Sequence, residues 1–132
     1  MRLLIVAVGI CTLAIGNQAR GQPTPKEKFT ESTTSTYSQK TLLKNWALAV
    51  CLASISKDAD AKEDAAVTAS AYLEFGRQPI EAYDQLSALA ERYAKRKYGG
   101  SVPGEFNTMK CIDLFHSKEL DTLAGRLSKT RP

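Results

Sequence analysis

The sequence predicts an all-α fold, a small bundle of about five helices, on three observations. The segment Trp46–Ile55 contains no charged residue, which is typical of a buried helix that is apolar on all sides. Apolar residues between Ile80 and Tyr93 recur at every third or fourth position, the spacing of an amphipathic helix. Since no stretch alternates between apolar and polar residues as a half-buried strand does, helices are the regular elements that we expect.

Residues 1–21 have the layout of a secretory signal peptide. Met1-Arg2 is a short positive region, Leu3–Ile15 is an uncharged apolar run, and Ala19-Arg20-Gly21 is an A-x-G cleavage pattern. The run is about 13 residues long, shorter than the roughly 20 residues that a membrane-spanning helix needs. We therefore expect export, cleavage after Gly21, and no membrane association of the mature chain. A buried N-terminal helix is the alternative.

The mature chain is expected to form a single domain, because it is long enough to bury one core only. Residues 1–21 hold two arginines and no acidic residue, so their removal lowers the net charge from +4 to +2. The remaining basic residues are spread out without interleaved aromatic residues, which argues against a nucleic-acid partner. Residues 22–37 are rich in Pro, Ser and Thr and predict a flexible lead-in to an all-helical domain over residues 38–132.

The first predicted helix begins near Ser38 or Thr41 and includes the uncharged segment. Cys51 lies in the middle of that segment, and Trp46 is expected to pack in the core. Because its neighbours must cover it on all sides, this helix is predicted to lie at the centre of the domain.

The second predicted helix opens at Asp58 and Asp60, where carboxylates face the positive end of the helix dipole. It runs to Phe75, and Gly76 follows as the natural C′ residue. The acidic start resembles part of a calcium loop, but Glu63 occupies the position where such a loop needs glycine. We therefore predict a helix start and no metal site.

The third predicted helix has Pro79 at its first position and ends at Gly99-Gly100. Its expected buried stripe consists of Ile80, Tyr83, Leu86, Ala90 and Tyr93. Basic residues gather near its end, at Arg92, Lys95, Arg96 and Lys97. They complement the helix dipole, so we interpret them as a solvated helix end in preference to an anion site.

Two short helices are predicted after the loop Gly99–Phe106. Asn107 is expected to cap the first and Ser117 the second, since both residue types accept hydrogen bonds from exposed helical N–H groups. The inner face of the last helix is expected to consist of Leu120, Leu123 and Leu127.

Two cysteines, Cys51 and Cys111, remain after cleavage because Cys11 leaves with the signal peptide. Cysteines in an oxidising compartment usually pair, which predicts a disulfide between the first and fourth helices. Free buried thiols or a catalytic thiol are the alternatives. The sole histidine, His116, is five positions from Cys111 and does not stack on it as an i,i+4 residue would, so no catalytic residue, metal or cofactor is predicted.

Three stretches of the chain resemble one protein family. They are Asn45–Cys51 (NWALAVC), Ala69–Gly76 (ASAYLEFG) and Gly104–Leu120 (GEFNTMKCIDLFHSKEL). The last is the most specific, because it joins the cysteine, the aromatic-His turn and the final helix at one spacing. The chain from about Ser38 to Leu127 thus resembles the type VI secretion amidase immunity proteins, which inhibit the fourth family of amidase effectors.

The resemblance implies a periplasmic, helical, homodimeric protein that is not an enzyme. Its partner would be an NlpC/P60-type cysteine peptidase that cuts the γ-D-glutamyl–diaminopimelate bond of peptidoglycan. A protruding loop of one subunit would plug the catalytic cleft of this effector, and a helix of the other subunit would add contacts. The alternatives are a cell-wall enzyme, for which a catalytic set is missing, and a generic periplasmic interaction module such as a lysozyme inhibitor.

The segment Gly99–Phe106 is the most strongly punctuated loop, and it immediately precedes the helix of Cys111. A loop attached near a disulfide loses less conformational freedom when it binds. We therefore predict that it forms the partner-binding loop, with an ordinary helix connector as the alternative. The residues assigned to it are Gly99, Gly100, Ser101, Val102, Pro103, Gly104 and Glu105, of which the four that are not glycine would enter or rim the cleft.

Overall fold

The structure, a computed structural model, describes Thr30 and residues 32–130, and within this part it contains helices and no strand. The elements are η1 (Thr33–Thr36), α1 (Gln39–Ile55), α2 (Ala59–Glu74), α3 (Ile80–Ala94), α4 (Asn107–His116) and α5 (Lys118–Leu127). The predicted all-α class with five α-helices is confirmed. The predicted signal peptide, residues 1–21, lies outside the described residues.

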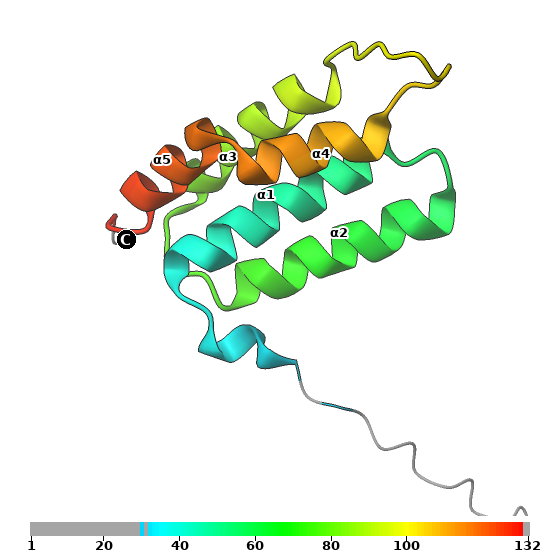
Figure 1. Ribbon diagram of the computed structural model, residues 1–132. Helices are drawn as coiled ribbons and strands as arrows, with labels where there is room; N and C mark the ends of the chain where they lie inside the picture. The colour runs from blue at the N-terminus through cyan, green and yellow to red at the C-terminus, as the bar shows by residue number, and fades with distance from the viewer. Residues whose placement is uncertain (1–29, 31, 131–132) are drawn as a thin grey trace, which may run out of the picture. The chain divides into compact units, whose positions relative to one another are not determined.

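α1 occupies the centre of the bundle. It packs against each of the other four α-helices, with α2 along one side and α3, α4 and α5 on the other (Figure 1). Ser38 caps its start, since the Ser38 hydroxyl accepts a hydrogen bond from the Thr41 N–H at 3.1 Å. Leu43, Ala47 and Cys51 of α1 are completely buried, as expected for a helix without a charged face over Trp46–Ile55. The predicted central helix is thus confirmed.

Regular structure begins before α1, inside the segment predicted as a flexible lead-in. η1 is a single 3₁₀ turn, and the Ser32 hydroxyl accepts a hydrogen bond from the Thr34 N–H at 3.2 Å. Thr34 is buried. Short hydroxyl side chains, which favour local turns when they bond to nearby backbone groups, account for this turn in a Ser/Thr-rich stretch.

α2 packs almost wholly against α1 and buries only two alanines, Ala65 and Ala69. Its predicted start is confirmed, because the Asp58 carboxylate accepts a 2.9 Å hydrogen bond from the Ala61 N–H. The small side chains let the two helices approach closely, and they leave most of the other face of α2 exposed.

Gly76 follows α2 as predicted but does not adopt the left-handed conformation of a typical C′ glycine, since no described glycine has a positive φ. Its role is steric. A Cβ added to Gly76 would lie 1.8 Å from the hydroxyl oxygen of Tyr83. Tyr83 is buried and packs edge-on against Trp46, with ring centroids 5.1 Å apart. Glycine is therefore required here by the close approach of α3 to the end of α2.

α3 differs from its prediction at both ends. Pro79 precedes the helix as its N-cap, and the helix ends at Ala94, before the basic residues Lys95–Lys97 and the predicted stop at Gly99. The predicted stripe is buried except for Ile80, the first residue of the helix, which is 61% exposed. The buried face is Ala82, Tyr83, Leu86, Leu89, Ala90 and Tyr93.

The last two helices are where the sequence predicts them. Ser117 caps α5 as predicted, since its hydroxyl accepts a 3.1 Å hydrogen bond from the Leu120 N–H. The prediction that Asn107 caps α4 is wrong. Phe106 is the N-cap, and Asn107 is the first helical residue, with its side chain bonded to Glu105 and Lys110.

Replacing Gly76 with alanine is expected to lower the free energy of unfolding by about 1–3 kcal/mol, because the buried Tyr83 ring must move away from the new methyl group. Chemical denaturation measures this change. Gly99→Ala is the matched control, since nothing lies within 4 Å of a Cβ at Gly99. Equal stability of the two variants would contradict the steric role of Gly76.

Candidate functional site

The residues predicted as the partner-binding loop, Gly99–Glu105, form an exposed segment between α3 and α4, called the exposed loop below. It projects away from the bundle (Figure 1). All seven of its residues are exposed, and Val102 is 67% exposed. The structure therefore brings the predicted residues together at the surface, where another molecule can reach them.

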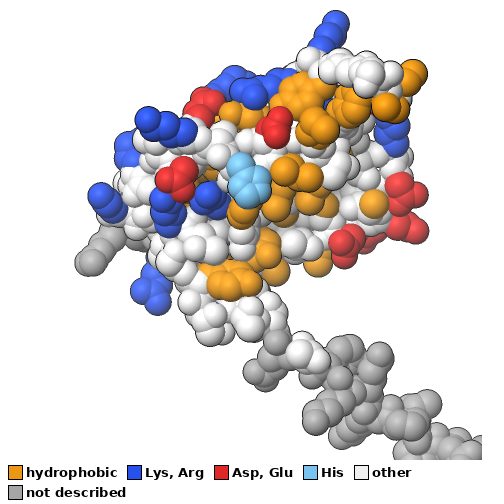
Figure 2. Space-filling model, in the orientation of Figure 1, with side chains coloured by type: hydrophobic (Ala, Val, Ile, Leu, Met, Phe, Trp, Pro, Cys, Tyr) orange, Lys and Arg blue, Asp and Glu red, His pale blue; other side chains and the backbone are white. Residues whose placement is uncertain are grey.

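Hydrophobic side chains gather near this loop. Figure 2 shows them on the part of the surface where Figure 1 places the exposed loop and the beginning of α4. The exposed large hydrophobic residues there are Val102, Met109 and Ile112. Exposed apolar side chains that lie close together are typical of surfaces that bind other proteins.

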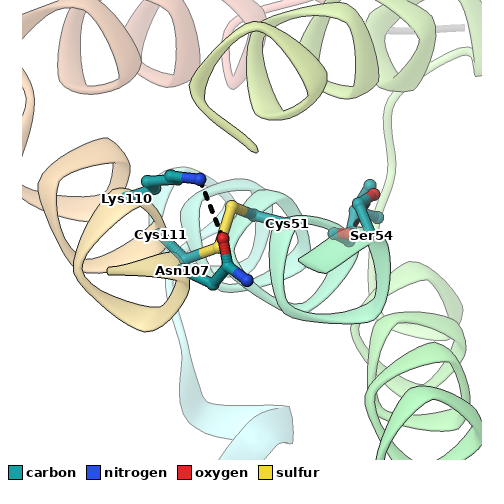
Figure 3. The surroundings of a disulfide bond; sticks show 6 residues. Cys51, Ser54, Asn107, Lys110 and Cys111 are labelled. Atoms are coloured by element: carbon teal, nitrogen blue, oxygen red, sulfur yellow. Dashed lines mark hydrogen bonds between the residues drawn. A yellow bond between two sulfur atoms is a disulfide. The ribbon is translucent and has the colours of Figure 1, made fainter. Parts of the chain in front are cut away.

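The predicted disulfide between Cys51 and Cys111 is confirmed. The Sγ–Sγ distance is 2.02 Å, the Cα–Cα distance is 5.6 Å, and both residues are completely buried. The bond joins the C-terminal part of α1 to the second turn of α4, shortly after the end of the exposed loop (Figure 3). A catalytic Cys111 is excluded, since a bonded sulfur cannot act as a thiolate nucleophile.

Phe106 closes the C-terminal end of the exposed loop. It has a φ of 51°, the only positive φ among the described non-glycine residues. This left-handed conformation turns the chain sharply into α4. The Phe106 ring then lies beside Gly100, since a Cβ added to Gly100 would be 3.3 Å from the ring. The two ends of the loop are thus in contact.

The Glu105 side chain is bonded to two other residues of the protein. Its carboxylate lies 2.9 Å from the Lys57 ammonium and accepts a 2.8 Å hydrogen bond from the Asn107 side-chain amide. The bond from Lys57, followed by that from Asn107, holds the pKa of the Glu105 carboxyl below its usual range. Among the predicted loop residues, Glu105 is therefore bound to the fold, whereas Ser101, Val102 and Pro103 are exposed and the last two have side chains that cannot form hydrogen bonds.

The basic residues that follow α3 lie at the other end of the exposed loop. Lys95, Arg96 and Lys97 are all exposed, and the Arg96 guanidinium packs over the Tyr93 ring, 3.3 Å from its centroid. Tyr98 donates a 2.7 Å hydrogen bond to Asp113 of α4, and this bond raises the pKa of the Tyr98 hydroxyl. Both contacts hold the segment before the loop against the bundle.

Sequence reasoning missed the residues that hold the exposed loop: Lys57, Tyr98, Lys110 and Asp113. Lys110 is only 7% exposed and donates a 2.8 Å hydrogen bond to Asn107 Oδ1. An i,i+3 pair on a helix, such as Asn107 and Lys110, is visible in a sequence. The contact between Lys57 and Glu105 joins distant segments and leaves no such signal.

His116 and the possible metal ligands do not form a site in the described part of the chain. His116 is exposed at the end of α4, and its ring packs edge-on against Phe115 at 5.4 Å. Within the described residues, no three His, Cys, Asp or Glu side chains could hold a metal ion. No described helix is long and apolar enough to cross a membrane. The exposed loop is therefore the feature of this surface that is suited to binding a partner.

A groove of about 410 Å³ lies between α1 and α2, away from the exposed loop. Its lining is mainly apolar and includes Trp46, Val50, Ala66, Ala69 and Leu73. It holds a single ionisable side chain, Lys62, and so offers no pair of groups for acid–base chemistry.

Comparisons with known proteins agree with this description. The family described as "Type VI secretion system (T6SS), amidase immunity protein" matches residues 41–124. A search of curated proteins finds no match.

Solved structures are also similar to the chain. One, of the effector–immunity system Tae4/Tai4 from Salmonella typhimurium, is 48% identical, with a TM-score of 0.72 over 78% of this chain and 100% of that one. Another, of the type VI effector–immunity complex Tae4–Tai4 from Enterobacter cloacae, is 30% identical and has a TM-score of 0.64. The match covers 73% of this chain and 98% of that chain. A third, from work on type VI-secreted toxins and self-resistance proteins in Serratia marcescens, is 29% identical and has a TM-score of 0.71. The match covers 86% of this chain and 92% of that chain.

Reduction of the Cys51–Cys111 disulfide is expected to lower the free energy of unfolding by about 4 kcal/mol, because the bond closes a loop with a sequence separation of 60. Denaturant titration with and without a reducing agent measures the change. A Cys51→Ala/Cys111→Ala variant, which has no bond to reduce, is the control. Equal stability of the oxidised and reduced protein would contradict this expectation.

Proposed function

This chain belongs to the family of type VI secretion system amidase immunity proteins, and we propose that it inhibits a secreted peptidoglycan amidase by occluding the amidase's active-site cleft. Members of the family are immunity proteins and not enzymes. The observation that carries the proposal is the exposed loop, whose residues 99–105 are all accessible while the segments on both sides are attached to the bundle.

Occlusion by such a loop follows from ordinary binding energetics. A flexible loop loses conformational freedom when it enters a cleft, and this loss weakens binding. The disulfide at Cys111, the Phe106–Gly100 contact and the Glu105 hydrogen bonds restrict the loop before any partner is present. Val102 can then bury apolar surface in the cleft, and the neighbouring glycines allow the backbone to approach the partner closely.

The partner is proposed to be an NlpC/P60-type cysteine peptidase that cuts the γ-D-glutamyl–diaminopimelate bond of peptidoglycan. The family resemblance supports this assignment, and the solved relatives from Salmonella typhimurium and Enterobacter cloacae are effector–immunity systems. A cysteine peptidase needs an accessible catalytic cleft to bind its substrate. A rigid loop seated there would prevent the substrate from entering.

The site of action is proposed to be the periplasm, where peptidoglycan is exposed to the amidase. The signal-peptide pattern of residues 1–21 and the disulfide support this location, since disulfides persist in oxidising compartments. The resemblance further supports a homodimer, in which one subunit supplies the loop and a helix of the other adds contacts.

Deletion of Gly100–Gly104 is expected to abolish inhibition of the cognate amidase, because the projecting part of the loop is removed while the bundle remains. Hydrolysis of peptidoglycan by the amidase at increasing protein concentration measures the effect. Val102→Asp should weaken inhibition at least tenfold, since an apolar contact would be replaced by a buried charge.

Val67→Asp on α2 is the matched control, because Val67 is 62% exposed and Val102 is 67% exposed. It should leave inhibition unchanged. If the folded deletion variant inhibits as well as the native protein, the loop does not occlude the cleft.

Protein purified from a periplasmic extract is expected to begin at Gln22, to contain no free thiol and to sediment as a dimer. Mass spectrometry under non-reducing conditions checks the first two properties, and analytical ultracentrifugation checks the third. Recovery of the full-length chain in the cytoplasm, or of a monomer at micromolar concentration, would contradict the corresponding part of the proposal.

A further inference from the structure

Asn107, the first residue of α4, connects two groups of opposite charge. Its Oδ1 accepts a 2.8 Å hydrogen bond from Lys110 Nζ, and its Nδ2 donates a 2.8 Å hydrogen bond to Glu105 Oε2. Glu105 also pairs with Lys57, which lies between α1 and α2. A continuous chain of polar contacts therefore runs from the α1–α2 connection, through the last residue of the exposed loop, to a buried turn of α4.

The partners of Asn107 fix the orientation of its side-chain amide. An ammonium group only donates hydrogen bonds, and an ionised carboxylate only accepts them. Lys110 must therefore face the amide oxygen, and Glu105 must face the amide nitrogen. Lys110 is 7% exposed and lies on the α4 turn that carries Cys111, beside the disulfide (Figure 3), so it has little freedom to move. The disulfide, Lys110 and Asn107 thus form one fixed unit.

The ion pair between Lys57 and Glu105 cannot hold the exposed loop by itself. The two side chains are 77% and 63% exposed, and ion pairs this exposed contribute little to stability. The hydrogen bond from Asn107 differs because its donor is oriented by a buried lysine. It therefore connects Glu105 to a buried part of α4, which the exposed ion pair alone does not do.

We infer that Asn107 is a positioning residue for the exposed loop. Its amide holds Glu105, and with it the C-terminal end of the loop, in one place relative to the Cys51–Cys111 disulfide. The consequence for partner binding rests on the proposed function. The rigidity of the loop, in contrast, is a property of the free protein and can be measured without any partner.

Asn107→Asp tests this inference with almost no change in shape. The new carboxylate still accepts a hydrogen bond from Lys110, but it repels Glu105 where the amide donated to it. The overall stability should not fall, because an acidic residue in the first turn of a helix is favoured by the helix dipole. A change confined to the exposed loop is therefore expected.

The main measurement is the backbone ¹⁵N order parameters of Gly99, Gly100, Ser101, Val102 and Gly104 in the free protein. In Asn107→Asp they are expected to fall from above about 0.6 into the flexible range below it. The association rate with the amidase should fall about two- to fivefold, the size of effect expected for one exposed polar contact. Asn45→Asp on α1 is the matched control and should change neither quantity.

A second substitution makes the test specific. In Asn107→Asp/Glu105→Gln, the side chain at position 105 can again donate to position 107 and accept from Lys57, so the order parameters and the association rate should return toward native values. Unchanged order parameters in the single variant, or no recovery in the double variant, would overturn the inference. If the order parameters respond and amidase inhibition does not, the positioning role stands and the proposed occlusion by the loop is wrong.

Discussion

The disulfide between Cys51 and Cys111 joins the buried centre of the domain to the helix that follows its exposed loop. Cys51 lies on α1, which packs against every other α-helix, so its position is fixed by the whole core. Cys111 lies on α4, whose first residue, Asn107, follows the loop almost directly. The bond therefore restricts the loop even though the loop itself buries almost no surface.

Stability and the proposed partner binding rely on different residues in this small domain. The core consists of leucines, alanines, two tyrosines and the two cysteines, whereas Val102, Met109 and Ile112 remain exposed near the loop. These three side chains contribute little to folding, because they are not buried in the free protein. The proposed inhibition by occlusion would require this division, since a surface that enters a cleft must be rigid and still uncovered.

Local sequence patterns predicted much of the fold. The helix starts near Ser38, at Asp58 and at Ser117 were predicted, the second from its acidic first turn and the third from a capping hydroxyl. In the structure all three side chains accept a capping hydrogen bond. The prediction for Gly76 was incomplete because it missed a tertiary contact, and the prediction for Asn107 was wrong because its side chain bonds to neighbouring side chains. Gly76 is required by the Tyr83 hydroxyl of another helix, and Asn107 bonds to side chains in place of the backbone.

The site was predicted only in part for the same physical reason. Glycine and proline mark the loop Gly99–Glu105 directly, because they favour turns. The contact of Glu105 with Lys57 joins segments that are far apart in the chain, and a single sequence carries no pattern for it. Which residues hold the loop in place therefore becomes visible only in the folded structure.

Occlusion of the amidase cleft can be tested most directly by photo-crosslinking within the complex. A photoreactive amino acid at position 102 of the mature protein should crosslink to the amidase peptide that carries the catalytic residues, as identified by mass spectrometry. The same amino acid at position 67 on α2 should give no crosslink to that peptide. Crosslinks from position 102 only to surfaces remote from the catalytic residues, with inhibition intact, would contradict occlusion by the loop.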